Sequence, residues 1–181
     1  TSGNSDVNLD SDFYVREFEF SAYSAIDHTW TGVLTLSSHK ESTSSETHIE
    51  VHEAFINSSK LFDLSTIKIG KFFLGFGRLN RFHRHDWAIT DAATVQKSFF
   101  GNEGAKDSGV EYTRNLPNLS SSLTVGVTKG DEFNHNHAHE HEGSNDTTHV
   151  DRAKSPTGYL RFAKFFEIST SKGFELGLNH I

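Results

Sequence analysis

Three observations predict an all-β protein folded as an antiparallel transmembrane β-barrel. Apolar and polar residues alternate with period two along most of the chain, in segments of about ten residues, which is the length of barrel strands. The connections between these segments alternate between short and long, as the turns and loops at the two ends of such barrels do. The 181 residues include 16 phenylalanines and only 2 prolines, a balance that favours regular strands with one apolar face.

Four strands are predicted in the first part of the chain, at about 14–26, 30–37, 47–56 and 66–74. Apolar residues recur at every second position along much of each strand, although Arg16 breaks the pattern in the first. In strand order, the apolar positions include Phe18 and Phe20, Leu34 and Leu36, Ile49 and Val51, and Ile67 and Ile69. In the third strand the two faces separate poorly from Glu53 to Ile56.

Four more strands are predicted at about 109–114, 122–129, 157–168 and 174–180. Their apolar positions include Val110 and Tyr112, Val125 and Val127, Leu160, Phe162 and Phe166, and Phe174, Leu176 and Leu178. The same alternation fits a soluble up-and-down barrel or sandwich whose apolar face points inward. The direction of these apolar side chains therefore decides between a membrane and a soluble protein.

The connections predict which end of the barrel carries the loops. The short ones are expected at 27–29, 57–65, 115–121 and 169–173, and the longer ones at 39–46, 75–108 and 130–156. Connections as long as 75–108 and 130–156 are uncommon in compact domains and are usually functional. The chain is treated as one domain, 1–181, with long loops at 75–108 and 130–156.

Composition excludes several classes of function. The net charge of −7 argues against nucleic acid as a partner, and the absence of cysteine excludes disulfides and thiol catalysis. No apolar run is long enough for a transmembrane helix. No arrangement of serine, histidine and aspartate and no phosphate-binding glycine loop stands out, so the protein is not expected to be an enzyme.

One segment, 51–117, resembles a family of bacterial outer-membrane porin-like proteins, some of which are associated with zinc. The residues that carry the resemblance are Glu53-Ala54-Phe55, Gly70-Lys71-Phe72-Phe73, Phe76-Gly77-Arg78-Leu79-Asn80, His83, His85 and Trp87, Phe99-Phe100-Gly101, Glu103-Gly104 and Asp107-Ser108-Gly109. The resemblance implies an outer-membrane barrel whose loop after the fourth strand folds toward the pore. It also implies a barrel of about twice this length, so the 181 residues are expected to be the N-terminal half of a barrel with about 14–18 strands.

A histidine-rich tract in the second long loop is the most specific candidate for metal binding. Imidazole binds Zn²⁺, Ni²⁺ and Cu²⁺ well, and carboxylates can complete the coordination. The candidate ligands are His135, His137, His139, His141, Glu140, Glu142 and His149. No obligatory cofactor is expected, and zinc, nickel or copper is expected only as an ion collected by this tract. The alternative is a solvated loop that binds metal incidentally.

The first long loop supplies a candidate constriction of the pore. Basic and acidic side chains on a loop inside a barrel narrow the passage and set up a transverse electric field. The candidate residues are Arg78, Arg81, His83, Arg84, His85, Asp86 and Asp91. The alternative is a salt-bridged plug or an external loop. Strand carboxylates such as Glu17, Glu19, Glu50 and Glu53 could also line the lumen, or simply form the polar face of half-wet strands.

The sequence therefore predicts an outer-membrane porin for passive diffusion of small hydrophilic solutes, with divalent metal ions such as zinc among the candidates. Its partners would be the lipid bilayer and the solute, with a homo-oligomer or other outer-membrane proteins as further candidates and no nucleic acid. Two alternatives stay open. One is a metal-capturing outer-membrane surface protein without pore activity, and the other is a soluble periplasmic ligand-binding β-barrel.

Overall fold

A computed structural model describes residues 17–40, 47–83, 86, 87, 94, 100, 104–130 and 155–181. These residues form a single antiparallel sheet of eight strands in which each strand pairs with the next along the chain. The strands are β1 (Glu17–Ala25), β2 (Thr31–Lys40), β3 (Thr47–Ser58), β4 (Ser65–Phe73), β5 (Lys106–Leu116), β6 (Ser121–Thr128), β7 (Thr157–Ser169) and β8 (Lys172–His180). The predicted all-β class, the antiparallel pairing and the number of strands are confirmed.

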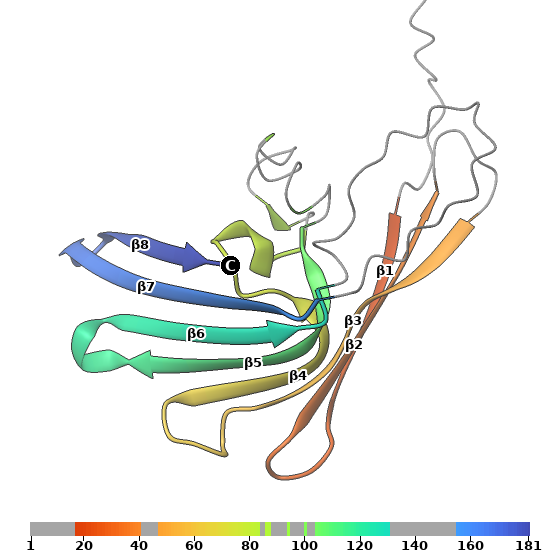
Figure 1. Cartoon of the computed structure of the whole chain (residues 1–181), viewed down its shortest axis with the longest axis horizontal. Coiled ribbons are helices and arrows are strands. Elements are labelled where there is room, and N and C mark those ends of the chain that lie inside the picture. Colours follow the sequence, from red (N-terminus) through yellow and green to blue (C-terminus); the bar gives the residue numbers. More distant parts are fainter. Residues whose placement is uncertain are drawn as a thin grey trace, which may run out of the picture.

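The eight strands do not close into a barrel. In the described chain β1 and β8 are the two edges of the sheet and do not pair with each other. The sheet instead curves strongly, so that it has a convex and a concave face (Figure 1). The curved antiparallel sheet expected for a barrel wall is therefore confirmed, but its closure into a barrel is not.

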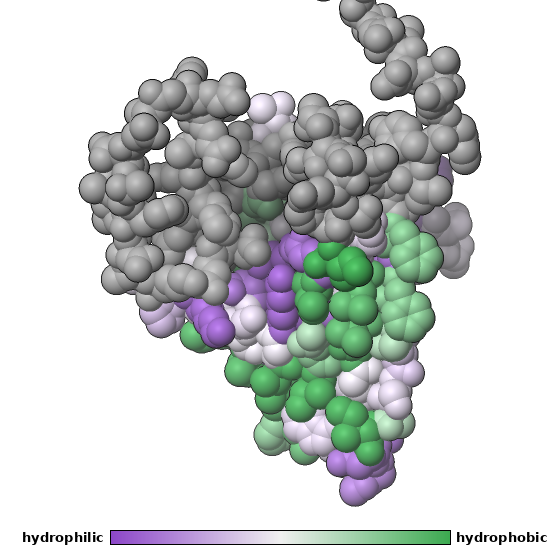
Figure 2. All heavy atoms as spheres, turned by 90° about the vertical axis from the view of Figure 1, so that its right-hand side faces the viewer, coloured by the Kyte–Doolittle hydropathy of each residue, from purple (hydrophilic) through white to green (hydrophobic). Residues whose placement is uncertain are grey.

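The convex face carries the apolar residues of the alternating pattern, and their side chains are exposed. Phe18 on β1 is 64% exposed and Leu178 on β8 is 68% exposed. Other apolar positions of the pattern, on these two strands and on those between them, are exposed as well: Phe20, Leu34, Ile49, Val51, Ile69, Val110, Val125, Val127, Leu160, Phe174 and Leu176. On the side formed by β1 to β3, hydrophobic residues make up much of the described surface (Figure 2).

The concave face carries polar and charged residues, and many of them are buried. This set includes Thr35, Ser37, His52, Lys106, Asp107, Glu111, Thr124, Thr128 and Arg161. The buried apolar residues are few by comparison, and Phe72, Leu74, Ala105 and Tyr159 form one small cluster. The described part of the molecule therefore has its apolar residues outside and its polar residues inside, the reverse of a soluble β-protein.

Two differences from the predicted strands have clear physical causes. β5 begins at Lys106 rather than at 109, because the polar Lys106 and Asp107 face the interior and so break the apolar alternation. The faces of β3 separate poorly because the pairing with β2 shifts register between Thr35 and Leu36, where His52 is the extra residue. Such a bulge changes the phase of the alternation from that residue on.

The connections partly follow the predicted lengths. β7 and β8 are joined by a tight turn and β5 and β6 by a short 3₁₀ helix (Pro117–Leu119), whereas the β4–β5 connection is long. The connection between β2 and β3, 41–46, is no longer than the one between β3 and β4, 59–64. The predicted distinction of short and long therefore fails at that loop. No described helix is long and apolar enough to cross a membrane.

Candidate functional site

The described part of the connection from β4 to β5 lies over the concave face of the sheet (Figure 1). Its two ends are held together by the buried side chain of Asn80, which lies in a short 3₁₀ helix (Leu79–Arg81). The Asn80 amide donates to the carbonyl oxygens of Leu74 and Ala105, and its oxygen accepts from the backbone N–H of Ala105. One side chain thus bonds three backbone groups at the two ends of the loop, which the backbone hydrogen bond from Leu74 N–H to the Ala105 carbonyl also joins.

Two side chains of the sheet fix the beginning of this loop. Glu111 on β5 is 7% exposed, and its carboxylate accepts from the backbone N–H of Gly75 at 2.8 Å and from the hydroxyl of Tyr159. Asn179 on β8 accepts from the backbone N–H of Gly77 at 2.8 Å. The loop is therefore attached both to the middle of the sheet and to its last strand.

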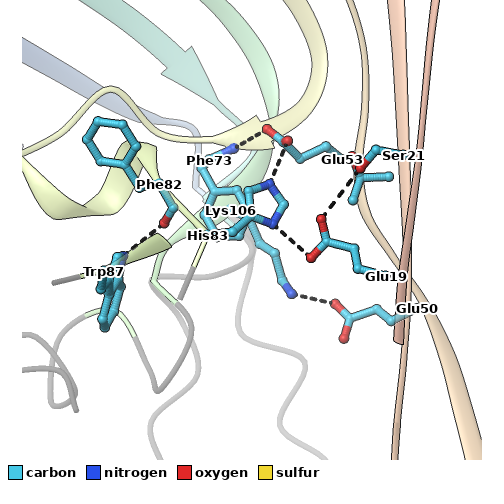
Figure 3. Close-up of polar contacts among 10 residues, drawn as sticks. Glu19, Ser21, Glu50, Glu53, Phe73, Phe82, His83, Trp87 and Lys106 are labelled. Carbon is cyan, nitrogen blue, oxygen red and sulfur yellow. Dashed lines mark hydrogen bonds and ion pairs between the residues drawn. The ribbon is translucent and has the colours of Figure 1, made fainter. Parts of the chain in front are cut away.

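His83 connects the loop to the opposite side of the sheet. Its Nδ1 lies 3.2 Å from a carboxylate oxygen of Glu19 on β1, and its Nε2 lies 3.0 Å from one of Glu53 on β3. Figure 3 shows the imidazole between the two carboxylates. Ionised carboxylates only accept hydrogen bonds, so these contacts favour the protonated ring. The hydrogen bond to Glu53, together with the charge of Glu19, raises the pKa of His83 above its ordinary value, although burial acts against this.

A second charged group lies beside this one. Lys106 at the start of β5 places its ammonium 2.9 Å from a carboxylate oxygen of Glu50, and Lys71 approaches the same oxygen at 3.7 Å. Figure 3 shows the Lys106–Glu50 contact next to His83. We call the space between the concave face and the described part of the β4–β5 loop the hollow. One wall of it is polar and consists of three glutamates of β1 and β3 with the basic groups that face them.

The β7–β8 side of the hollow is rich in arginine. Arg161 on β7 is buried and pairs with Glu175 on β8. Arg81 on the loop lies close enough to Arg161, Glu175 and Arg78 to respond to their charges. Arg78 and Arg81 are themselves exposed. The hollow is therefore acidic along β1 and β3, where basic groups partly compensate, and carries arginines near β7.

The predicted constriction residues fall into two groups. Arg78, Arg81 and His83 lie on the concave side, and Asp86 is exposed next to them along the chain. Arg84, His85 and Asp91 lie outside the described residues, as does the whole predicted metal tract: His135, His137, His139, His141, Glu140, Glu142 and His149. The acidic groups that face the described loop come from strands of the sheet, chiefly Glu19 and Glu53, rather than from the loop itself.

Several interior residues were missed by the sequence analysis. His52 lay in a strand with poorly separated faces, and only the bulge explains why it is 3% exposed and faces inward. Glu111, Tyr159 and Asn80 looked like ordinary strand or loop residues. One signal could have pointed to Glu111 and Arg161, since each is a charged residue flanked along its strand by large apolar or aromatic residues.

The concave site thus combines an anchored loop, a charged wall and a Glu–His–Glu contact, and among the described residues Glu19, His52 and His83 are placed so that they could hold a metal ion. Comparisons with protein-family models, with curated proteins and with solved structures find no match for this chain.

Proposed function

We propose that this chain forms the wall of a channel in a bacterial outer membrane, through which small hydrophilic solutes diffuse passively. The observation that carries the proposal is the reversed distribution of side chains: exposed apolar residues on the convex face and buried polar residues on the concave face. Lipid accepts such an apolar face without cost, whereas water does not. A soluble ligand-binding barrel would turn the same residues inward.

The open edges of the sheet support a larger assembly. In hydrocarbon, every backbone N–H and C=O group must find a partner, and the outer edges of β1 and β8 lack a neighbouring strand in the described chain. The proposed wall is therefore completed by further strands, either from a longer form of the chain or from another chain. A barrel of more than eight strands also leaves room for an aqueous passage beside the inserted loop.

The loop and its charges support selective passage. A loop that is hydrogen-bonded to Glu111, Asn179, Glu19 and Glu53 narrows the interior at fixed positions. Arginines near β7 and glutamates on β1 and β3 create a field across the remaining space. Solutes would then be selected by size and charge, and divalent cations collected by the histidine tract are one candidate cargo.

Conductance of the full-length protein in planar bilayers tests this proposal. We expect discrete conductance steps, and we expect R78Q/R81Q to shift the ion selectivity toward cations because it removes two positive charges from the passage. Lys60→Gln is the matched control, since Lys60 lies in the turn between β3 and β4, and it should leave selectivity unchanged. Absence of conductance from correctly folded protein would overturn the proposal. Isolation of the folded protein in water without detergent would overturn it as well.

A further inference from the structure

Three potential metal ligands from distant parts of the chain meet on the concave face. They are Glu19 on β1, His52 on β3 and His83 on the loop after β4, and one ligand atom of each lies within 4.8 Å of those of the others. We infer that these residues form a binding site for a divalent transition-metal ion, with zinc as the best candidate. This goes beyond the proposed function, because the site contains none of the residues of the histidine tract and does not depend on conduction.

The donor atoms are spaced almost as a metal ion would require. Zinc binds histidine nitrogen and carboxylate oxygen at about 2.0–2.2 Å, so two ligand atoms on one tetrahedral ion lie about 3.3 Å apart. The Nδ1 of His83 and the carboxylate oxygen of Glu19 are already 3.2 Å apart. The remaining separations, up to 4.8 Å, can close by small rotations of side chains. Two imidazoles and one carboxylate are a common donor set for zinc.

Glu53 supplies the supporting contact that metal-binding histidines normally have. Such a histidine binds the metal with one ring nitrogen and donates from the other to a carboxylate, which fixes the tautomer and the ring orientation. Here the Nε2 of His83 faces Glu53 at 3.0 Å, so Nδ1 is the nitrogen directed at the Glu19 side. Glu53 itself is held by the backbone N–H of Phe73 at 3.4 Å.

Packing around the two histidines restricts their motion. The ring of buried Phe73 meets the His83 ring at 4.9 Å between centroids and the His52 ring at 6.3 Å, both edge to face. The two imidazole centroids are 6.1 Å apart. The bulge in β3 is what turns His52 to this side, and bulges often redirect a side chain at a functional site.

The local charge also suits a dication. Glu19 and Glu53 together carry two negative charges, which equal the charge of one Zn²⁺ ion between neutral imidazoles. In the absence of metal, the Nδ1 of His83 holds a proton that points toward Glu19. A metal ion that binds this nitrogen would displace the proton into solvent. With three protein ligands, one coordination position stays open for water or an anionic solute.

Zinc and cobalt binding to a tract-deficient protein tests the inference. The background replaces His135, His137, His139, His141 and His149 by alanine in the full-length protein, so that only the proposed site is measured. We expect one Zn²⁺ per chain by isothermal titration calorimetry. We also expect the visible absorption of tetrahedral Co²⁺ with histidine ligands.

Variants in this background identify the ligands. H52A and H83A should each lower zinc affinity at least tenfold, and E53Q should lower it by about tenfold because it weakens the supporting contact. H28A and H180A are matched controls, since both residues are exposed and neither belongs to the cluster, and they should leave affinity unchanged. H83Q provides a second test in case H83A fails to fold, with folding monitored by the heat-induced shift in gel mobility.

Two results would overturn the inference. One is a folded tract-deficient protein that binds neither zinc nor cobalt at micromolar concentration. The other is unchanged affinity in both H52A and H83A. Neither result bears on the channel, because conductance is measured separately and a pore can exist without this site.

Discussion

The two faces of the sheet differ in what they contact and in how their residues are held. On the convex face, residues such as Phe20, Val125 and Leu176 are apolar and exposed. On the concave face, Glu111, Arg161 and their neighbours are buried and bound to named partners on other strands or on the inserted loop.

In the proposed channel, the usual arrangement of stabilising forces would be reversed. The convex face would then need only an apolar surrounding, so its residues could replace one another provided they stay apolar. The concave face depends on particular hydrogen bonds, and removing one partner there leaves a buried polar group unsatisfied. Substitutions should therefore obey different rules on the two faces.

The largest effect is expected from a charge on the convex face. Val125 lies in the middle of β6, paired with Tyr112 and Leu160. If the proposed channel is right and this face meets lipid, V125R should cost about 2–4 kcal/mol of folding free energy in a bilayer, because arginine would replace a lipid-facing apolar side chain. Folding into vesicles at increasing urea concentration measures this.

Thr66→Arg is the matched control, because Thr66 shares the concave face with Lys68 two residues further along β4. We expect a change of about 0.5 kcal/mol there. Equal effects of V125R and T66R would remove the distinction between the two faces, and an exposed arginine tolerated at 125 would indicate that this face meets water.

Loss of the loop anchor should have the next largest effect. N80A removes three hydrogen bonds and leaves buried backbone groups of Leu74 and Ala105 without this partner, at a cost of about 3 kcal/mol. We expect faster proteolysis within 74–105, because the two ends of the loop separate. Asn115→Ala, at an exposed position of β5, should leave the rate of proteolysis unchanged. A loop equally resistant in N80A would show that other contacts hold it.

Removal of a single hydroxyl inside the hollow should have a moderate effect. Y159F deletes the hydrogen bond to the buried carboxylate of Glu111, and bonds to charged groups contribute about 2 kcal/mol. Y23F, on a tyrosine that is 70% exposed, should change stability by about 0.5 kcal/mol or less. Urea unfolding of both variants measures the contrast, and similar values would contradict the assigned role of Tyr159.

The smallest effect is expected in the turn between β1 and β2, which belongs to neither face. The carboxylate of Asp27 accepts from the backbone N–H groups of Thr29 and Trp30, and these hydrogen bonds lower the pKa of Asp27 below 3.8. A lowered pKa stabilises the fold above pH 3.8, and this contribution is lost as the pH falls through the lowered value.

D27N keeps an acceptor in this turn but does not titrate. The stability difference between the wild type and D27N should therefore be fully present above pH 3.8 and should disappear as the pH falls through the lowered pKa of Asp27. Unfolding curves at a series of pH values check this. A difference that grows as the pH falls would reverse the expected sign.

The sequence predicted the fold better than it predicted the site. Alternation identified the eight strands, and it correctly grouped residues such as Phe18, Leu34 and Leu178 on one face. The alternation placed the start of β5 too late along the chain. Lys106 and Asp107 are two consecutive buried polar residues, so the apolar alternation does not extend to the first residues of the strand. The described residues of the predicted constriction, Arg78, Arg81 and His83, lie on the concave side. Glu19 and Glu53, which contact His83, were among the strand carboxylates expected to line the lumen, whereas nothing in the pattern pointed to Glu111 and Asn179, which hold the start of the loop.

The sequence by itself determined the strands and the two faces, because period-two patterning needs only neighbouring residues. The tertiary structure decided which face is turned outward, since the same pattern fits a sheet curved in either direction. It also decided the meeting of Glu19, His52 and His83. That meeting depends on a bulge in β3 and on the path of a loop that crosses the sheet, and neither is encoded in the local spacing of residues.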